Sequence, residues 1–258
     1  MPIINYPENG HANCLQLEDQ SFWFQHRNNC ILTIIHRFPP SGAILDIGGG
    51  NGIVAQRIIA EGFSTVLIEP GSVGARNAKQ IRKIPDVINA RFEDINFEHG
   101  SVNAAGLFDV LEHIDEKIFL DKLWKALKPK GLVYLTVPAH NWLWSYSDVH
   151  AGHLRRYNVE MIRNLLREKF ILKFFTYTFS ALLLPVFLFR ALPYRLSPNS
   201  SHGLLSSNTE FGTGNSFVVK LLSCFLNKEY QHLLAGKKIL FGTSCLIVLE
   251  KINEKNSL

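Results

Sequence analysis

An acid at the end of an apolar run, followed directly by a glycine-rich turn, is the feature of this chain best suited to bind a ligand. The segment Ile44-Leu-Asp-Ile-Gly-Gly-Gly-Asn-Gly52 places Asp46 beside four glycines. Glycines permit dihedral angles and approach distances that a Cβ forbids, and the N–H groups of a following helix point at whatever lies there. We therefore predict a nucleotide-cofactor site at the end of a buried strand.

The glycine spacing bears on which cofactor would bind. A dinucleotide fingerprint needs a third glycine three positions after the second. Gly48 and Gly50 supply the first two, but position 53 is Ile. A second apolar run ends in Glu69, and an acid there is placed to bind both ribose hydroxyls. Such an acid serves NAD and S-adenosylmethionine alike, so the missing glycine alone counts against a nicotinamide cofactor.

Three later segments follow this turn in the order that one protein family shows: Phe92–Phe97, Gly106–Ile114 and Leu127–Pro138. With them the chain resembles the class I S-adenosylmethionine-dependent methyltransferases, in the type 11/12-like branch that includes ubiquinone-biosynthesis O-methyltransferases. The resemblance covers about residues 18–178 and resumes at 238–251. It implies an α/β fold: a Rossmann-like, doubly wound, seven-stranded sheet with an antiparallel last strand, in which the three segments form the third, fourth and fifth sheet segments.

By that resemblance the cofactor is S-adenosyl-L-methionine. The glycine turn and its acid would hold the methionine part, Glu69 the ribose, and residues 92 and 93 would flank the adenine. Arg91 stands where many relatives carry an acid, so adenine recognition would rely on backbone groups and Phe92. Plain capping or core packing remains an alternative for each position. The residues implied to bind the cofactor are Asp46, Gly48, Gly50, Gly52, Glu69, Phe92, Glu93 and Phe108.

The loop after the expected fifth strand, residues 137–157, concentrates histidine, tryptophan, tyrosine and arginine. In a doubly wound sheet such a loop leaves the carboxyl edge and hangs over the ligand crevice. Aromatic side chains there can cover an acceptor, and arginines can bind an anionic part of it. The acceptor-binding residues we predict are Trp142, Trp144, Arg155, Arg156 and Tyr157.

Methyl transfer requires a deprotonated acceptor held in line with the sulfonium, so a hydroxyl or ammonium acceptor needs a base. Histidine titrates near neutrality and suits that role. The candidates are His150, His153 and His113, the last of which could equally anchor a helix start. A metal site built from His150, His153 and Asp148 is weaker, because two histidines without the rest of a zinc signature prove little. We predict no metal.

An N-terminal helix is expected outside the nucleotide fold. Apolar residues recur at helical spacing from Ile31 to Phe38, and Pro39-Pro40 stops them. Trp23 precedes this pattern, and we interpret it as a packing residue. Arg27 could pair with the cofactor carboxylate or with a surface acid.

Composition fits one large α/β domain, since 258 residues with 47% hydrophobic content can bury a core. The net charge of +5 is spread along the chain, so we expect no nucleic acid partner, although an anionic membrane surface stays open. With no signal-peptide pattern, we expect cytoplasmic localisation, with peripheral membrane contact as an alternative. The expected divisions are an N-terminal helical extension (1–40), the cofactor-binding core (41–178), an apolar helical insert or cap (179–237), and the last strand with a tail (238–258).

The insert carries the apolar run Ala181–Leu196. Only sixteen charge-free residues separate Lys173 from Arg190, whereas a membrane-spanning helix wants about twenty, and Pro185 would kink it. We therefore predict no membrane span. The insert could cap a lipophilic acceptor pocket, lie in a membrane interface, or form a buried helical hairpin; residues 197–208 read as a loop.

Together these features predict an S-adenosylmethionine-dependent methyltransferase that acts on a small or lipid-linked acceptor at oxygen. The preference for oxygen follows from the resemblance and not from the residues. Two alternatives stay open. The chain could bind the cofactor as a catalytically silent partner subunit, or, less favoured, act as an NAD-dependent oxidoreductase.

Overall fold

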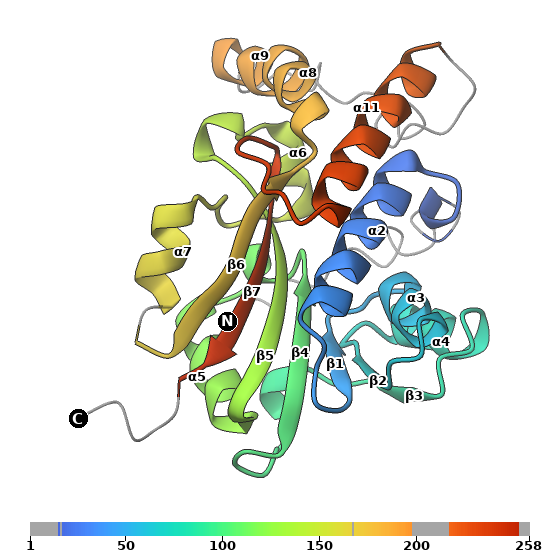
Figure 1. Ribbon diagram of the computed structural model, residues 1–258, viewed down its shortest axis with the longest axis vertical. Coiled ribbons are helices and arrows are strands. Elements are labelled where there is room, and N and C mark those ends of the chain that lie inside the picture. The colour runs from blue at the N-terminus through green and yellow to red at the C-terminus, as the bar shows by residue number, and fades with distance from the viewer. Residues whose placement is uncertain (1–14, 16, 167, 198–216, 253–258) are drawn as a thin grey trace.

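The protein is described from a computed structural model, which places residues 15, 17–166, 168–197 and 217–252. Within these residues seven strands form one sheet in the order β3-β2-β1-β4-β5-β7-β6 (Figure 1). β7 runs antiparallel to both of its neighbours, and the other strands are parallel. The strands are β1 (Ile44–Ile47), β2 (Thr65–Ile68), β3 (Asp86–Ile88), β4 (Val102–Phe108), β5 (Leu127–Pro138), β6 (Phe170–Thr178) and β7 (Ser244–Lys251).

Helices cover both faces of the sheet. One apolar cluster joins the sheet to α2, α3 and α11, and another joins it to α5 and α7. The helices are α2 (Phe22–Arg37), α3 (Ile53–Ala60), α4 (Ser72–Gln80), α5 (Glu116–Ala126), α6 (Tyr146–Ala151), α7 (Val159–Leu166), α8 (Leu183–Val186), α9 (Leu192–Leu196) and α11 (Phe217–Leu234). Short turns of 3-10 helix are η1 (Phe92–Asp94), η2 (Leu111–His113), η3 (Asn141–Leu143) and η4 (Ser180–Leu182), and η5 (Phe187–Ala191) is a π-helical turn.

Side-chain alternation along the strands decides which residues reach which face. In β5, Tyr134 belongs to the α2 and α3 cluster, whereas Val133 and Leu135 belong to the α5 and α7 cluster. Because successive strand residues point to opposite faces, Thr136 shares the face of Tyr134, and Asp46 shares the face of Ile44. Both polar side chains therefore lie under α2 at the carboxyl edge of the sheet.

This architecture confirms the predicted Rossmann-like fold, including the antiparallel last strand. One local assignment was wrong. The segment Phe92–Phe97 is not the third strand; β3 ends at Ile88, and Phe92 reaches the core from the η1 turn instead. The fourth strand ends at Phe108, as the resemblance implied, because Asp109 takes a left-handed conformation (φ 59°) that breaks the ladder. The domain boundaries given above stay predictions.

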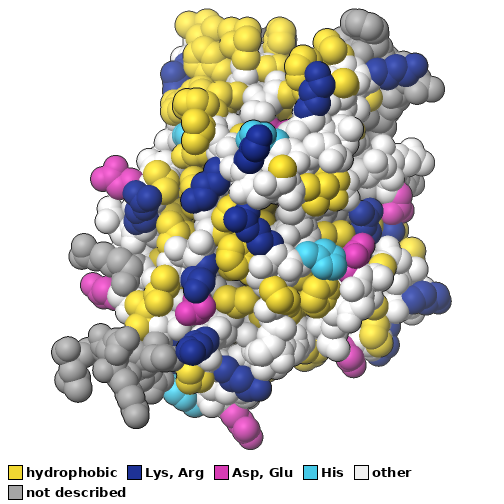
Figure 2. Space-filling model, in the orientation of Figure 1, with side chains coloured by type: hydrophobic (Ala, Val, Ile, Leu, Met, Phe, Trp, Pro, Cys, Tyr) yellow, Lys and Arg dark blue, Asp and Glu magenta, His cyan; other side chains and the backbone are white. Residues whose placement is uncertain are grey.

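The insert contains two different surfaces. α11 packs along α2, and its Leu226 and Leu233 are buried (Figure 1). The segment from α8 to α9 instead exposes Leu184, Leu188, Phe189 and Leu196, which we call the α8–α9 apolar surface. Figure 2 shows hydrophobic side chains gathered over this end of the molecule. The predicted loop 197–208 lies, apart from its first residue, outside the described residues.

As predicted, none of the helices in the described ranges combines the length and apolar character needed to cross a membrane. Leu233 of α11 joins the apolar cluster that contains α2.

A buried carboxylate joins α2, α11 and the end of β6. Glu229 accepts hydrogen bonds from the backbone N–H groups of Phe179 (2.6 Å) and Ser180 (2.7 Å), and its Oε1 lies 2.8 Å from His26 Nε2. Burial alone would raise the pKa of Glu229, but the bonds from His26 and Ser180 hold it below its ordinary value. This junction fixes how α2 lies across the carboxyl edge.

We expect Glu229→Ala to destabilise the protein by about 3 kcal/mol, because it leaves several buried donors without an acceptor. Chemical denaturation measures the change. Glu61→Ala, which removes an exposed partner of His36, is the matched control and should change stability by no more than about 0.5 kcal/mol. Equal losses in the two variants would contradict a structural role for the junction.

Candidate active site

The glycine turn after β1 brings backbone close to the end of the sheet. Gly48 (φ 71°) and Gly50 (φ 56°) take left-handed conformations that favour glycine. A Cβ at Gly49 would lie only 2.7 Å from Asp46 Oδ2. The turn ends at Gly52, which caps the N-terminus of α3. Any side chain at position 49 would therefore press on the carboxylate below it.

Asp46 is 1% exposed, and within the described residues its Oδ2 has no hydrogen-bond partner. Burial raises the pKa of Asp46 to about 7; Arg27 lowers the pKa and Glu69 raises it. A buried carboxylate without a partner is costly unless a cationic group reaches it. The α-ammonium of S-adenosylmethionine is such a group, so the residues present fit this cofactor.

Glu69, directly after β2, faces the same turn. Its Oε2 accepts from the Gly50 N–H (2.9 Å), and its Oε1 accepts from the Gly71 N–H (2.7 Å). Both carboxylate oxygens are thus held by backbone donors at the end of β2. The position of Glu69 suits a contact with ribose hydroxyls, and that contact stays a prediction.

The residues predicted to flank the adenine have partners within the protein or lie in its core. Phe92 is buried and its ring contacts Phe97 and Phe119, with centroids 5.2 and 4.8 Å away. Glu93 lies 3.4 Å from Arg91 in an ion pair. Phe108 is buried in the cluster under α2. Cofactor roles for these residues stay predictions.

A pocket of about one water molecule's size lies under α2 at the ends of four strands. Arg27 closes one side: its guanidinium donates to the Phe108 carbonyl (2.9 Å), and its Nε lies 2.6 Å from Asp109 Oδ2. Thr136 donates to the other oxygen of Asp109 (2.9 Å). The lining residues are Trp23, Arg27, Cys30, Asp109, Thr136, Thr178, Phe179, Ser244 and Leu246.

Three of the predicted acceptor-binding residues have partners within the protein. Arg156 is buried and forms a two-point ion pair with Asp148 (2.7 and 3.0 Å). Arg155 pairs with Glu116 (2.8 Å), and the Tyr157 hydroxyl donates to the same carboxylate (2.6 Å). These contacts hold the loop to α5 and α6. Acceptor binding by the three residues stays a prediction.

The two tryptophans differ in their surroundings. Trp142 is exposed, stacks on His140 (5.5 Å between centroids) and contacts Phe187 of η5 edge-on (5.6 Å). Arg195 donates to its carbonyl (2.8 Å), so the loop is tied to the insert. Trp144 is half-buried at the end of η3.

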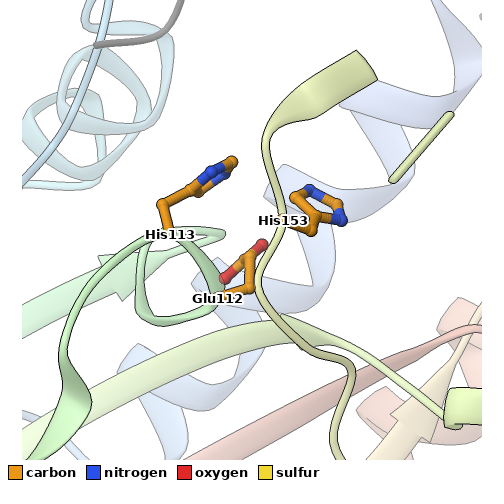
Figure 3. Close-up of side chains that lie close together, drawn as sticks. All are labelled: Glu112, His113 and His153. Carbon is orange, nitrogen blue, oxygen red and sulfur yellow. The ribbon is translucent and has the colours of Figure 1, made fainter. Parts of the chain in front are cut away.

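The structure brings two of the three candidate histidines together. The rings of His113 and His153 lie 4.9 Å apart, and Glu112 is beside them (Figure 3). Burial, followed by the neighbouring His153, lowers the pKa of His113 to about 4, so this ring is neutral at pH 7. His150 lies exposed on α6 and is not part of this group.

Comparison with known proteins agrees with this geometry. Residues 23–169, more than half of the chain, match the family model described as a methyltransferase domain. The chain belongs to this methyltransferase family. With its sheet order and its acid-and-glycine turn, it is a class I S-adenosylmethionine-dependent methyltransferase domain.

The relatives of this methyltransferase are distant. It is 32% identical over 103 residues to the mitochondrial ubiquinone biosynthesis O-methyltransferase of Schizosaccharomyces pombe, a match that spans 36% of each chain. Among solved structures, it resembles phosphoethanolamine N-methyltransferase 2 of Haemonchus contortus in complex with S-adenosyl-L-methionine, with 18% identity and a TM-score of 0.56. The match covers 97% of this chain and 59% of that chain. A Haloferax volcanii putative methyltransferase in complex with the Trm112 activator gives a TM-score of 0.61 at 14% identity, covering 95% of this chain and 97% of that one. The structural likenesses show the fold.

Sequence reasoning missed three contributors to the site. Glu112 and Asp109 follow the fourth strand, in a segment where only Phe108 and His113 were singled out. Glu18 binds both Asn51 (3.1 Å) and Arg82 (3.0 Å) and fastens the N-terminal segment to the glycine turn. The polar residues of the glycine turn could have suggested such a partner but not its identity.

The raised pKa of Asp46 predicts that cofactor binding depends on pH. Below about pH 7 the carboxyl is protonated and loses its attraction for the ammonium group. We expect the affinity for S-adenosylhomocysteine to fall roughly five- to tenfold from pH 7.5 to pH 6. Asp46→Asn should bind more weakly and lose this dependence. Calorimetric titration at both pH values tests this, and an identical pH profile in the variant would contradict it.

Proposed function

We propose that this methyltransferase transfers a methyl group from S-adenosylmethionine to an oxygen atom of a small or lipid-linked acceptor. The observation that carries the proposal is the pocket under α2. Asp109 and Thr136 line it at the same sheet edge as Asp46, whose Oδ2 has no partner among the described residues. One edge thus offers a cofactor site and a small polar pocket, where we place the reacting hydroxyl group of the acceptor.

The charges of the pocket favour a neutral acceptor over a cationic amine. Asp109 is the one acid among its lining residues, and Arg27 and Thr136 already bind its two oxygens. The remaining polar lining consists of Thr178 and Ser244, whose hydroxyls suit an uncharged oxygen group. The 32% identity to an O-methyltransferase over 103 residues supports the same choice.

Bound S-adenosylmethionine supplies a methyl group on a sulfonium sulfur. The protein itself must position the acceptor, cover the pocket and remove a proton from the acceptor. Trp23 of α2 stacks on Phe179 (5.2 Å between centroids), and this pair covers the pocket and limits the entry of water. We propose His153 as the base, because the lowered pKa of the neighbouring His113 makes that ring a weak proton acceptor.

An acceptor with a long apolar tail would explain the α8–α9 apolar surface. Phe189 is 64% exposed and Leu196 is 76% exposed. Arg195 lies over the Phe187 ring (6.0 Å), so a cation borders this surface. Exposed apolar side chains bordered by basic groups suit the headgroup boundary of an anionic membrane. We propose peripheral contact of this surface with such a membrane.

Labelled methyl transfer tests the function. We expect the protein to methylate a hydroxyl of a polyprenylated catechol, with a lower KM than for the same catechol without its tail, and to leave phosphoethanolamine unmodified. Asp46→Ala should abolish transfer because the cofactor is lost. Transfer to the amine alone would contradict the proposal. Tight cofactor binding without transfer to any hydroxyl acceptor would favour the silent partner subunit.

Sedimentation with phosphatidylglycerol vesicles tests the membrane contact. Phe189→Asp combined with Leu196→Asp should weaken binding at least about threefold, because it removes exposed apolar area and adds repulsion. Ile118→Asp, at an exposed apolar position on α5, is the matched control and should bind like the unaltered protein. If the unaltered protein stays in the supernatant, the α8–α9 apolar surface serves another purpose.

A further inference from the structure

Phe179, where β6 leads into the insert, has an unusual backbone conformation for a bulky residue (Figure 1). Its φ of 61° lies in the left-handed region, which phenylalanine rarely adopts because its Cβ approaches a backbone carbonyl. Such conformations persist where the surrounding structure holds them, and they cluster at ligand sites. The Phe179 side chain is 1% exposed and lines the pocket under α2. The strained residue is thus part of the wall of the proposed acceptor pocket.

Polar and steric contacts hold the backbone of Phe179 in this conformation. Glu229 of α11 accepts hydrogen bonds from the N–H groups of Phe179 (2.6 Å) and Ser180 (2.7 Å), and the Ser180 hydroxyl donates to the same carboxylate. The chain before β7 lies directly against this strand end, because a Cβ at Gly242 would collide with the Thr178 carbonyl. The backbone of this wall is therefore fixed.

Two rings of α2 hold the Phe179 side chain. Trp23 stacks on it, with centroids 5.2 Å apart and an angle of 13° between the ring planes. His26 meets it edge-on at 4.9 Å, and His26 Nε2 lies 2.8 Å from Glu229 Oε1. The same carboxylate thus fixes the backbone of Phe179 and one of the rings beside it. The Phe179 ring could turn aside only with the loss of these packing contacts.

The pocket beside this ring has room for a reacting group and little more. It holds about one water molecule. Among its described lining residues, Trp23 and Phe179 carry the large rings, and Phe179 is the more buried of the two. The charged lining residues, Arg27 and Asp109, are held by their ion pair (2.6 Å). Shortening the Phe179 side chain would therefore enlarge the pocket and leave its polar groups in place.

From these contacts we infer that Phe179 is a specificity-determining residue, which sets the size of the acceptor group that the pocket admits. A hydroxyl fits beside its ring, whereas a hydroxyl with a bulky neighbouring substituent meets the ring and is excluded. An ordinary core phenylalanine would need neither the left-handed backbone nor the carboxylate that holds it. The role in acceptor choice rests on the proposed function, but the effect of Phe179 on the size of the pocket does not.

Cys30 allows a test of the pocket that needs no methyl transfer. Its thiol lines the same pocket, whereas Cys245 is buried in the apolar cluster with α5 and α7. Peptide mass spectrometry measures how fast each thiol reacts with methyl methanethiosulfonate and with the larger benzyl methanethiosulfonate. We expect the benzyl-to-methyl rate ratio at Cys30 to rise at least about tenfold in Phe179→Ala and about threefold in Phe179→Leu, because the enlarged pocket admits the larger reagent. The reaction of Cys245 should not change.

Phe175→Ala is the matched control, because this phenylalanine lies on the same strand but packs on the cluster with α5 and α7. It should leave the rate ratio at Cys30 unchanged. An unchanged ratio in both Phe179 variants would overturn the inference. Equal acceleration at Cys30 and Cys245 would overturn it as well, because it would show that Phe179 only packs the core.

Methylation of two acceptors then tests the role in specificity. One is catechol, and the other is a catechol with a tert-butyl group beside each hydroxyl. Phe179→Ala should raise kcat/KM for the bulky acceptor relative to catechol at least about tenfold, and Phe175→Ala should leave this ratio unchanged. An unchanged ratio in Phe179→Ala would overturn the role in specificity. If the unaltered protein methylates no hydroxyl acceptor, the proposed function fails, and the labelling of Cys30 still decides whether Phe179 sets the size of the pocket.

Discussion

The guanidinium group of Arg27 is the interaction on which the carboxyl edge of the sheet depends. Several acidic residues lie at this edge, where the parallel strands end, and burial opposes their ionisation. Arg27 lowers the pKa of both Asp46 and Glu112, which among the described residues are the buried acids with an unpartnered oxygen, and it pairs directly with Asp109. The guanidinium group of Arg27 thus offsets negative charge on both the cofactor side and the acceptor side of this edge.

The position of Arg27 depends in turn on packing far from the glycine turn. One helical turn of α2 holds His26, which meets Glu229 of α11, and the same carboxylate binds the backbone where β6 ends. The insert is therefore a structural support for the site as well as an apolar surface. A hydrophobic segment outside the nucleotide fold thus helps to hold the helix that carries Arg27.

Chemistry at this edge is divided between two carboxylates with different neighbours. Asp46 faces a backbone turn that no side chain can fill, which suits a ligand with a cationic end. Glu112 lies beside the imidazoles of His113 and His153. Both are buried and incomplete in the protein alone, so bound groups would supply the missing partners and stabilise the fold as they bind.

The sequence by itself determined the fold class and the glycine turn, because these depend on local patterns: an apolar strand, the acid after it, and glycines that tolerate positive φ. Asp46 and Glu69 were found that way. Only the tertiary structure decided that His113 meets His153 beside Glu112 and that His150 does not. It also decided that Arg156 is bound by Asp148, and that Glu229 meets His26 across 203 residues. Periodicity and spacing report which face of an element a residue occupies, but long-range packing selects its partner.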